Sequence, residues 1–221
     1  MVKIYEFDVL TDKDYDLIKE HLQNSGIIIY PTETSYAIGG NALDDNAVKK
    51  IYGFKDRNFK KPLPVLVKDL KMLVDVAELK RPEENLISKF WPGPLTIIFK
   101  LKKNIFSKNY LFTGGSDSIA ARISPHTFAE KIFEKIDFPL ISTSANSSGK
   151  DSFSDFNELN KIFLSSITEK DGANILAINA GELAGGSSTI IKLLKNGKNI
   201  EVVREGENNI KKRLMCSIKN K

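Results

Sequence analysis

The sequence predicts one α/β domain built on a mixed, mostly antiparallel sheet, and three observations support this class. Short apolar runs alternate with segments of helical periodicity along the whole chain. The last two apolar runs, residues 188–194 and 200–204, are joined by a short Asn-Gly-Lys connection that is typical of hairpins. With 221 residues, 41% of them hydrophobic, and no repeat or low-complexity linker, the chain can bury a single sizeable core.

Helices are expected where apolar residues recur every three or four positions. Residues 12–23 show this spacing, and Thr11 or Asp12 can cap the start of the helix. The same spacing predicts helices over residues 44–54 and 83–90, the second of which begins just after a proline. Further helices are predicted over residues 127–135, 155–164 and 210–215.

Strands are expected at short apolar runs bounded by turn residues. The predicted strands cover residues 27–30, 63–67, 95–101, 118–123, 140–143, 175–179, 188–194 and 200–204. Residues 91–94, with the sequence WPGP, form a rigid turn before one of them, because the two prolines fix φ on either side of a glycine.

Composition excludes several classes of site. The single cysteine, Cys216, allows neither an intramolecular disulfide nor a cysteine-based zinc site. His21 and His126 lie far apart and form no metal-binding pattern. No segment has the length of a membrane span or the form of a signal peptide, so a cytoplasmic location is expected. The net charge of +5 and the pI of 9.1 only mildly favour polyanionic partners, because the lysines are scattered.

Two polar segments follow predicted buried strands and indicate an anion-binding site. The first, residues 30–36, reads YPTETSY and is followed by Lys55 and Arg57. The second, residues 142–149, reads STSANSSG. Hydroxyls, an amide and fixed cations at strand ends suit a phosphate-bearing ligand such as a nucleotide.

Each of these signals, taken alone, also has an ordinary structural explanation. Lys55 and Arg57 follow a predicted helix, where cations are common. Arg122 and Arg204 can pair with local acids, and the glycine-rich residues 185–189 can be a plain loop entering a strand. The combination and order of the segments are therefore more informative than any one of them.

Six segments in a fixed order resemble a known family. They read PTETSYAIG at residues 31–39, KDR at 55–57 with KPL at 61–63, WPGPLT at 91–96, AARISPH at 120–126, TSANSSG at 143–149, and STII at 188–191 with REG at 204–206. The chain resembles the YrdC-like family, threonylcarbamoyl-AMP synthases of the tRNA t6A pathway, from about residue 10 to residue 207.

The resemblance implies a nucleotidyltransferase that condenses L-threonine, bicarbonate and ATP to threonylcarbamoyl-AMP and releases pyrophosphate. The carbamate formed on the threonine amine attacks the α-phosphorus of ATP, so no covalent enzyme nucleophile is required. Catalysis then depends on positioning the reactants and stabilising phosphate charge. Mg²⁺ is expected with ATP, held mostly by phosphate and water.

By similarity to the family's sites, the polar residues receive expected roles. The residues expected to contact L-threonine are Thr34, Arg122, Ser142 and Ser188. The residues expected to contact ATP are Arg57, Lys61, Ser118, Ser144 and Arg204. The family's catalytic tetrad corresponds to Lys55, Arg57, Ser144 and Asn146, and no residue is assigned to a metal.

The resemblance also implies an organisation and a partner. Residues 1–210 are expected to form the YrdC-like domain, with a twisted sheet flanked by helices and a concave basic cleft, and residues 211–221 a lysine-rich tail. The resemblance implies the short, single-domain type of the family. The product is expected to pass to a tRNA threonylcarbamoyl transferase complex, and weak direct binding of tRNA or other RNA is a further expectation. Asn58 and Leu66 depart from residues common in relatives.

Two other functions remain open at this point. The basic pI favours an RNA-binding module, although the aromatic residues lie mostly at core-like spacings rather than in an exposed stacking set. A paralogue with an altered substrate is the other alternative. Intact Lys55, Arg57, Ser144 and Asn146 argue against loss of the site.

Overall fold

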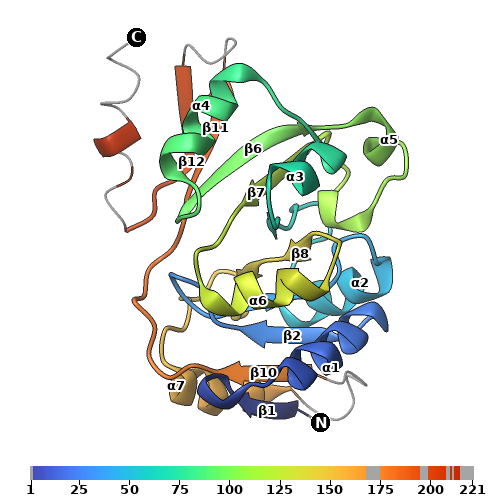
Figure 1. The fold of residues 1–221 in the computed structure, drawn as a ribbon, viewed down its shortest axis with the longest axis vertical. Helices are drawn as coiled ribbons and strands as arrows, with labels where there is room; N and C mark the ends of the chain where they lie inside the picture. The colour runs from blue at the N-terminus through green and yellow to red at the C-terminus, as the bar shows by residue number, and fades with distance from the viewer. Residues whose placement is uncertain (1, 168–174, 195–198, 208–209, 211, 215–221) are drawn as a thin grey trace.

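The computed structural model describes residues 2–167, 175–194, 199–207, 210 and 212–214. Within this part of the chain the strands form two mixed sheets, one at the bottom and one at the top of Figure 1. The predicted α/β class with parallel and antiparallel strands is confirmed, but the strands are divided between two sheets, whereas the sequence predicts one.

The lower sheet has the strand order β1-β10-β2-β3-β9 among the described residues. Its strands are β1 (Val2–Glu6), β10 (Ile175–Asn179), β2 (Ile27–Tyr30), β3 (Ala37–Gly39) and β9 (Thr143–Ser144). The first three are parallel, whereas β3 is antiparallel to both of its neighbours. All four residues of β2 are buried, as expected for a central strand that reads as a continuous apolar run.

The upper sheet has the order β12-β11-β6-β7-β4-β8, with β5 pairing to β6 off this path. Its strands are β12 (Asn199–Arg204), β11 (Thr189–Leu194), β6 (Leu95–Leu101), β7 (Ser118–Arg122), β4 (Val65–Leu66), β8 (Leu140–Ile141) and β5 (Ala77–Glu78). The predicted pairing of the last two strands is confirmed, since β11 and β12 are antiparallel, whereas the predicted turn between them lies outside the described residues.

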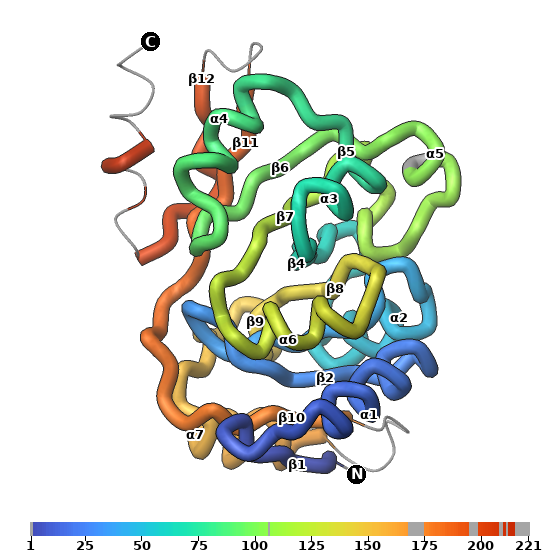
Figure 2. Tube along the Cα trace, viewed as in Figure 1, coloured from blue at the N-terminus to red at the C-terminus, as the bar shows by residue number. Residues whose placement is uncertain are grey.

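The two sheets meet where the chain passes from β8 to β9. The sequence predicts one strand over residues 140–143, but the structure places β8 in the upper sheet and β9 in the lower one, with Ser142 between them (Figure 2). Ser142 N–H donates to the carbonyl of Pro64, next to β4, at 2.8 Å. A Cβ on Gly39 would lie 2.2 Å from the Ile141 carbonyl oxygen, so only glycine allows this close approach.

Among the described residues, the helices are α1 (Asp12–Gln23), α2 (Asp45–Phe54), α3 (Leu70–Val76), α4 (Arg81–Phe90), α5 (Lys103–Phe106), α6 (Thr127–Lys135) and α7 (Phe156–Ile162). Helices α3, α4 and α5 lie beside the upper sheet, and α1 and α7 lie beside the lower one (Figure 1). In the described part of the chain, short 3₁₀ segments lie at Phe7–Val9, Leu111–Thr113 and Leu164–Ser166. The helices α1 and α6 have the predicted bounds, whereas α3, α5, β1, β3 and β5 were not predicted.

Helix α1 shows how local sequence sets a boundary. The Thr11 side chain and Asp14 form a capping box, in which Asp14 Oδ2 accepts from the Thr11 backbone N–H at 2.8 Å. Lys135 on α6 then joins the two helices, because its ammonium lies 2.8 Å from Asp12 and 3.0 Å from Asp16.

The proposed domain boundary at residue 210 stays a prediction. Most of residues 211–221 and part of the predicted helix over 210–215 lie outside the described residues. Ile210 and Leu214 are both buried against the core. Among the described residues, no helix combines the length and apolar character that a membrane span requires.

Candidate active site

A cavity of about 440 Å³ lies at the junction of the two sheets. The β2–β3 loop and the β9 segment contribute Thr32, Thr34 and Ser144 from the lower sheet. Strands β6, β7, β11 and β12 contribute side chains from the upper sheet, including Arg122 and Arg204. Segments that lie more than a hundred residues apart in the sequence therefore line the same cavity.

Three arginines line this cavity, as the sequence predicts for an anion site. They are Arg57, Arg122 and Arg204. Burial lowers the pKa of Arg204, and the nearby positive charge of Arg122 lowers it further. Guanidinium groups remain charged at neutral pH, so Arg204 brings a fixed positive charge to the cavity.

Arg204 and Arg57 are both held in place by hydrogen bonds to backbone carbonyls. Arg204 donates to the carbonyl of Ser188 from Nε at 3.1 Å and from Nη2 at 2.8 Å, and Nη2 also lies 2.9 Å from the Ser188 hydroxyl oxygen. Arg57 donates to the carbonyls of Lys61 at 3.3 Å and Pro62 at 3.0 Å. These contacts hold the guanidinium groups in place before any ligand arrives.

Arg122 is held differently, by a carboxylate. It is only 6% exposed, and its Nη1 forms an ion pair with Oε1 of Glu33. The other carboxylate oxygen of Glu33 accepts from the Ser124 hydroxyl at 2.5 Å. The pairing joins the β2–β3 loop to the end of β7, across the junction of the two sheets.

Lys55 is buried behind the cavity wall and does not line it. Its ammonium donates to the carbonyl of Ser144, to the carbonyl of Asn146 at 2.9 Å and to the side-chain oxygen of Asn146 at 2.8 Å. Burial lowers the pKa of Lys55 to about 7, with a smaller contribution from the charge of Arg57. Lys55 thus secures the loop after β9 and has no direct access to a ligand in the cavity.

Ser144 and Asn146 both line the cavity, and they are hydrogen-bonded to each other. The Ser144 hydroxyl donates to the Asn146 side-chain oxygen at 2.7 Å. The Asn146 amide in turn donates to the carbonyls of Lys150 at 2.5 Å and Asp151 at 3.0 Å. With Lys55, they form a continuous polar network under one side of the site.

The predicted threonine-contacting residues all line the cavity: Thr34, Arg122, Ser142 and Ser188. Of the predicted ATP-contacting residues, Arg57, Ser144 and Arg204 line it and Lys61 and Ser118 do not. Lys61 is on an exposed loop. Ser118 is on β7 two and four residues before the lining Ala120 and Arg122, and therefore on the same face of that strand.

Several lining residues were not predicted as site residues. They include Thr32, Thr96, Asp151 and Glu207. Thr96 donates to the Ser188 hydroxyl at 3.0 Å, so it helps to orient a predicted contact. Thr96 lies inside the WPGPLT segment, and this motif is the sequence signal that could have identified it as a site residue. Among the described residues, no group of three or more His, Cys, Asp or Glu side chains is arranged to hold a metal ion.

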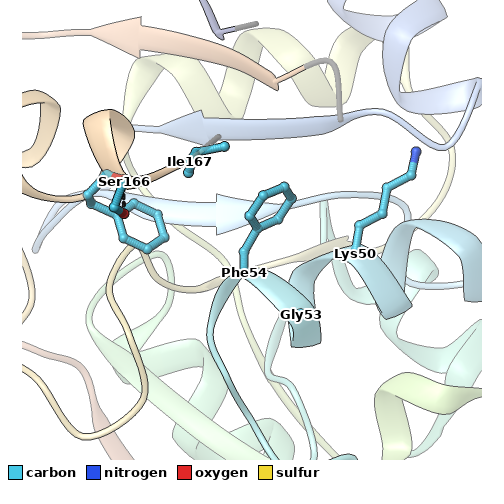
Figure 3. A pocket seen from close by; sticks show the side chains of 6 residues that line it. Lys50, Gly53, Phe54, Ser166 and Ile167 are labelled. Carbon is cyan, nitrogen blue, oxygen red and sulfur yellow. Dashed lines mark hydrogen bonds between the residues drawn. The ribbon is translucent and has the colours of Figure 1, made fainter. Parts of the chain in front are cut away.

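A second cavity, of about 300 Å³, lies elsewhere, between α2 and the Leu164–Ser166 segment (Figure 3). Its lining includes Phe54, Phe163 and one cation, Lys50. The Lys50 ammonium already donates to the carbonyl of Ser25 at 2.7 Å. The junction cavity, with three arginines and many hydroxyls, is therefore the better candidate for the functional site.

Comparison with known proteins agrees with the sequence motifs. The family Sua5_yciO_yrdC, described as "Telomere recombination", matches residues 20–206. A putative threonylcarbamoyl-AMP synthase from Methanocaldococcus jannaschii is 34% identical over 98% of this chain and 97% of its own length. A threonylcarbamoyl-AMP synthase from Pyrococcus abyssi is 38% identical over 59% of this chain, which corresponds to 38% of that protein.

A solved structure supports the same assignment. The crystal structure of P. abyssi Sua5 complexed with L-threonine superposes with a TM-score of 0.79 and 29% identity, covering 93% of this chain and 57% of that one. This chain therefore spans little more than half of that relative's length. The match over residues 20–206 and the nearly full-length archaeal relative show that the chain belongs to the Sua5/YciO/YrdC family.

Proposed function

We propose that this chain is an L-threonylcarbamoyladenylate synthase, a nucleotidyltransferase that converts L-threonine, bicarbonate and ATP to threonylcarbamoyl-AMP and pyrophosphate. The observation that carries the proposal is the convergence of Arg57, Arg122 and Arg204 on one hydroxyl-lined cavity. Carbamate and triphosphate are both anions, and fixed cations are needed to offset their repulsion. The M. jannaschii relative, which this chain matches over 97% of its length, is described as a putative synthase of this kind.

The amino-acid end of the site is assigned to Arg122 and the hydroxyls of Thr34, Ser142 and Ser188, all of which line the cavity. A guanidinium can form two parallel hydrogen bonds to a carboxylate and so fix its orientation. The relative that was crystallised with L-threonine shares the fold over 93% of this chain, which supports this assignment.

The nucleotide end is assigned to Arg57, Arg204 and Ser144, with Lys61 and Ser118 as outlying contacts. Arg57 and Arg204 are oriented by backbone carbonyls, which suits them to stabilise phosphate charge without reorganising. Lys61 lies on an exposed loop and does not line the cavity, and we assign it to the outer phosphates by the motif alone. Lys55 and Asn146 contribute by holding the Ser144 segment in position.

The reaction assigned to the site needs no enzyme nucleophile. The threonine amine combines with bicarbonate to give a carbamate and water. A carbamate oxygen then forms a bond to the α-phosphorus of ATP, and the bond from that phosphorus to the pyrophosphate oxygen breaks. The contribution of the protein is to hold the two anions in line and to stabilise charge on the phosphoryl oxygens.

Mg²⁺ is assigned to the substrate rather than to the protein. The described residues hold no cluster of three or more metal-ligating side chains, and Asp151 and Glu207 are the acidic residues that line the cavity. A magnesium ion that arrives bound to ATP keeps phosphate and water ligands, which agrees with this sparse set.

The product is a mixed carbamic–phosphoric anhydride, which can transfer its threonylcarbamoyl group. We expect the acceptor to be tRNA, modified by a separate threonylcarbamoyl transferase complex in the cytoplasm. Weak direct tRNA or RNA binding by this chain remains part of the proposal.

Release of pyrophosphate tests the activity directly. The protein is incubated with ATP, Mg²⁺ and bicarbonate, with L-threonine, with L-serine, or with no amino acid. We expect release to depend on L-threonine and to be far lower with L-serine. Release that is equal in all three mixtures, or absent from all of them, would contradict the proposal.

A further inference from the structure

Glu33 lies beside the candidate active site without forming part of its surface. Its neighbours Thr32 and Thr34 both line the cavity, whereas Glu33 does not. The side chain of Glu33 is 14% exposed and that of Arg122 is 8% exposed. The carboxylate therefore approaches Arg122 from the protein side of the cavity wall.

Both oxygens of this carboxylate are engaged. Oε1 pairs with Nη1 of Arg122, and Oε2 accepts from the Ser124 hydroxyl at 2.5 Å. The Ser124 hydroxyl oxygen also accepts the backbone N–H of His126 at 3.2 Å, at the start of α6. Glu33 is thus fixed by the last residue of β7 and by one residue of the β7–α6 connection, and it cannot rotate without breaking both contacts.

The ion pair with Glu33 restricts the orientation of the Arg122 guanidinium. A guanidinium has five N–H donors in one plane, so a carboxylate bound at one of its terminal nitrogens limits the orientation of the whole group. Since Arg122 also lines the cavity, its other donors are available on the cavity side. A nearly buried arginine with no partner would in addition carry a large desolvation cost.

We propose that Glu33 is a positioning residue, which orients the guanidinium of Arg122 so that it receives the carboxylate of the amino-acid substrate. This inference rests on the proposed function for the identity of that substrate. Glu33 acts through Arg122 and does not itself touch the ligand, so its effect is expected on amino-acid affinity and not on nucleotide affinity.

Binding of L-threonine, measured by titration calorimetry on the full chain, is the primary readout. The isosteric variant Glu33→Gln keeps the shape of the side chain but removes its charge. We expect its Kd for L-threonine to rise about tenfold, as misplacement of an orienting group predicts. The Kd for Mg·ATP is expected to stay within about twofold of the wild-type value. Glu158→Gln, at an exposed glutamate of α7, is the matched control and is expected to change neither constant.

A double-mutant cycle distinguishes positioning from general destabilisation. Arg122→Lys keeps the positive charge but removes the planar fork. If Glu33 acts through that fork, adding Glu33→Gln to Arg122→Lys should change the Kd for L-threonine by less than about twofold. If Glu33→Gln fails to fold, Ser124→Ala tests the same idea, because it removes the second anchor of the carboxylate and leaves the ion pair.

The outcomes separate this inference from the proposed function. A tenfold effect of Glu33→Gln that persists in the Arg122→Lys background, or an equal loss of Mg·ATP affinity, overturns the positioning role. The same holds if the wild-type protein does not bind L-threonine at all. If the wild-type protein binds L-threonine but releases no pyrophosphate, the proposed activity is wrong, while the Kd values still decide the role of Glu33.

Discussion

The ammonium of Lys55 donates to Asn146 twice, to its backbone carbonyl at 2.9 Å and to its side-chain oxygen at 2.8 Å. A third hydrogen bond goes to the carbonyl of Ser144. Three acceptors match the three N–H donors of an ammonium group. The residue that the motif places among the catalytic groups is thus a buried anchor for the loop that presents Ser144 and Asn146 to the cavity.

The first prediction concerns this anchor. Lys55→Met keeps much of the side-chain volume but leaves the three oxygens without their donor. We expect the free energy of unfolding to fall by about 2–4 kcal/mol, because buried acceptors lose their partner. Threonine-dependent pyrophosphate release should fall at least as strongly, since Ser144 and Asn146 lose their fixed positions. Urea denaturation and the pyrophosphate assay measure the two effects.

Lys49→Met is the control for this variant, because Lys49 is an exposed lysine on the same helix, α2. It should leave stability within about 0.5 kcal/mol of wild type. Equal stability of the two variants would show that the Lys55 network contributes nothing to the fold.

The same lysine predicts a dependence of stability on pH. In the folded protein the pKa of Lys55 is lowered to about 7 from its usual 10.5, so between these values the unfolded state binds more protons. The free energy of unfolding should therefore increase as the pH rises through this window. Urea denaturation from pH 7 to 9.5 should show a steeper rise for wild type than for Lys55→Met. Parallel curves would mean that Lys55 keeps its proton throughout.

Arg57 provides a test of phosphate stabilisation. It lines the cavity and is held by the carbonyls of Lys61 and Pro62, so its removal should not disturb the core. We expect Arg57→Ala to lower kcat by about 100-fold, the usual cost of losing one preorganised donor to developing charge. The circular dichroism spectrum should stay unchanged. The neighbouring exposed Lys60→Ala serves as the control, and a fully active Arg57→Ala protein would exclude the assigned role.

His126 predicts a loss of stability in acid. Its Nδ1 accepts the backbone N–H of Phe128 at 3.1 Å and caps α6. Burial lowers its pKa below the usual 6.5, although the negative charges of Glu33 and Glu130 oppose this shift. The folded state therefore resists protonation, and stability should fall as the pH drops below 6.5.

The variant His126→Asn keeps a capping oxygen but does not titrate. We expect it to lose less stability than wild type between pH 7 and pH 5. The pKa of His21 is also lowered by burial, so His21 should account for the pH dependence of stability that remains in the variant. An identical pH profile for both proteins would contradict the role given to His126.

Sequence reasoning found most regular elements because their signals are local. The helical spacing and cap at Thr11 gave α1 its bounds, and continuous apolar runs gave β2 and β6 theirs. The strand β1 was not predicted, because it is a short edge strand with mostly exposed or half-buried residues. The change of sheet at Ser142 was not predicted either, since one apolar run contains no signal for which partner each half pairs with.

Contacts within the candidate active site that join distant segments could not be predicted from the sequence either. Only part of the cavity lining was predicted from motifs: Arg57, Arg122, Ser144 and Arg204 were found in this way, whereas Thr32, Thr96, Asp151 and Glu207 were not. Glu33 stands inside one of those motifs, yet its partner Arg122 is 89 residues away along the chain. Local periodicity cannot report a contact at that separation. The buried position of Lys55 was hidden for the same reason, because its acceptors belong to a segment 89 to 91 residues away.

The central claim is that L-threonine, bicarbonate and ATP are condensed into one product in a single cavity. An assay with isotope-labelled bicarbonate tests this claim most directly. The wild-type protein is incubated with labelled bicarbonate, L-threonine and Mg·ATP, and the nucleotide products are analysed by mass spectrometry. The account predicts a product that contains AMP, threonine and one labelled carbon, formed in equal amount with pyrophosphate. Pyrophosphate released without a labelled threonine–AMP adduct would contradict it.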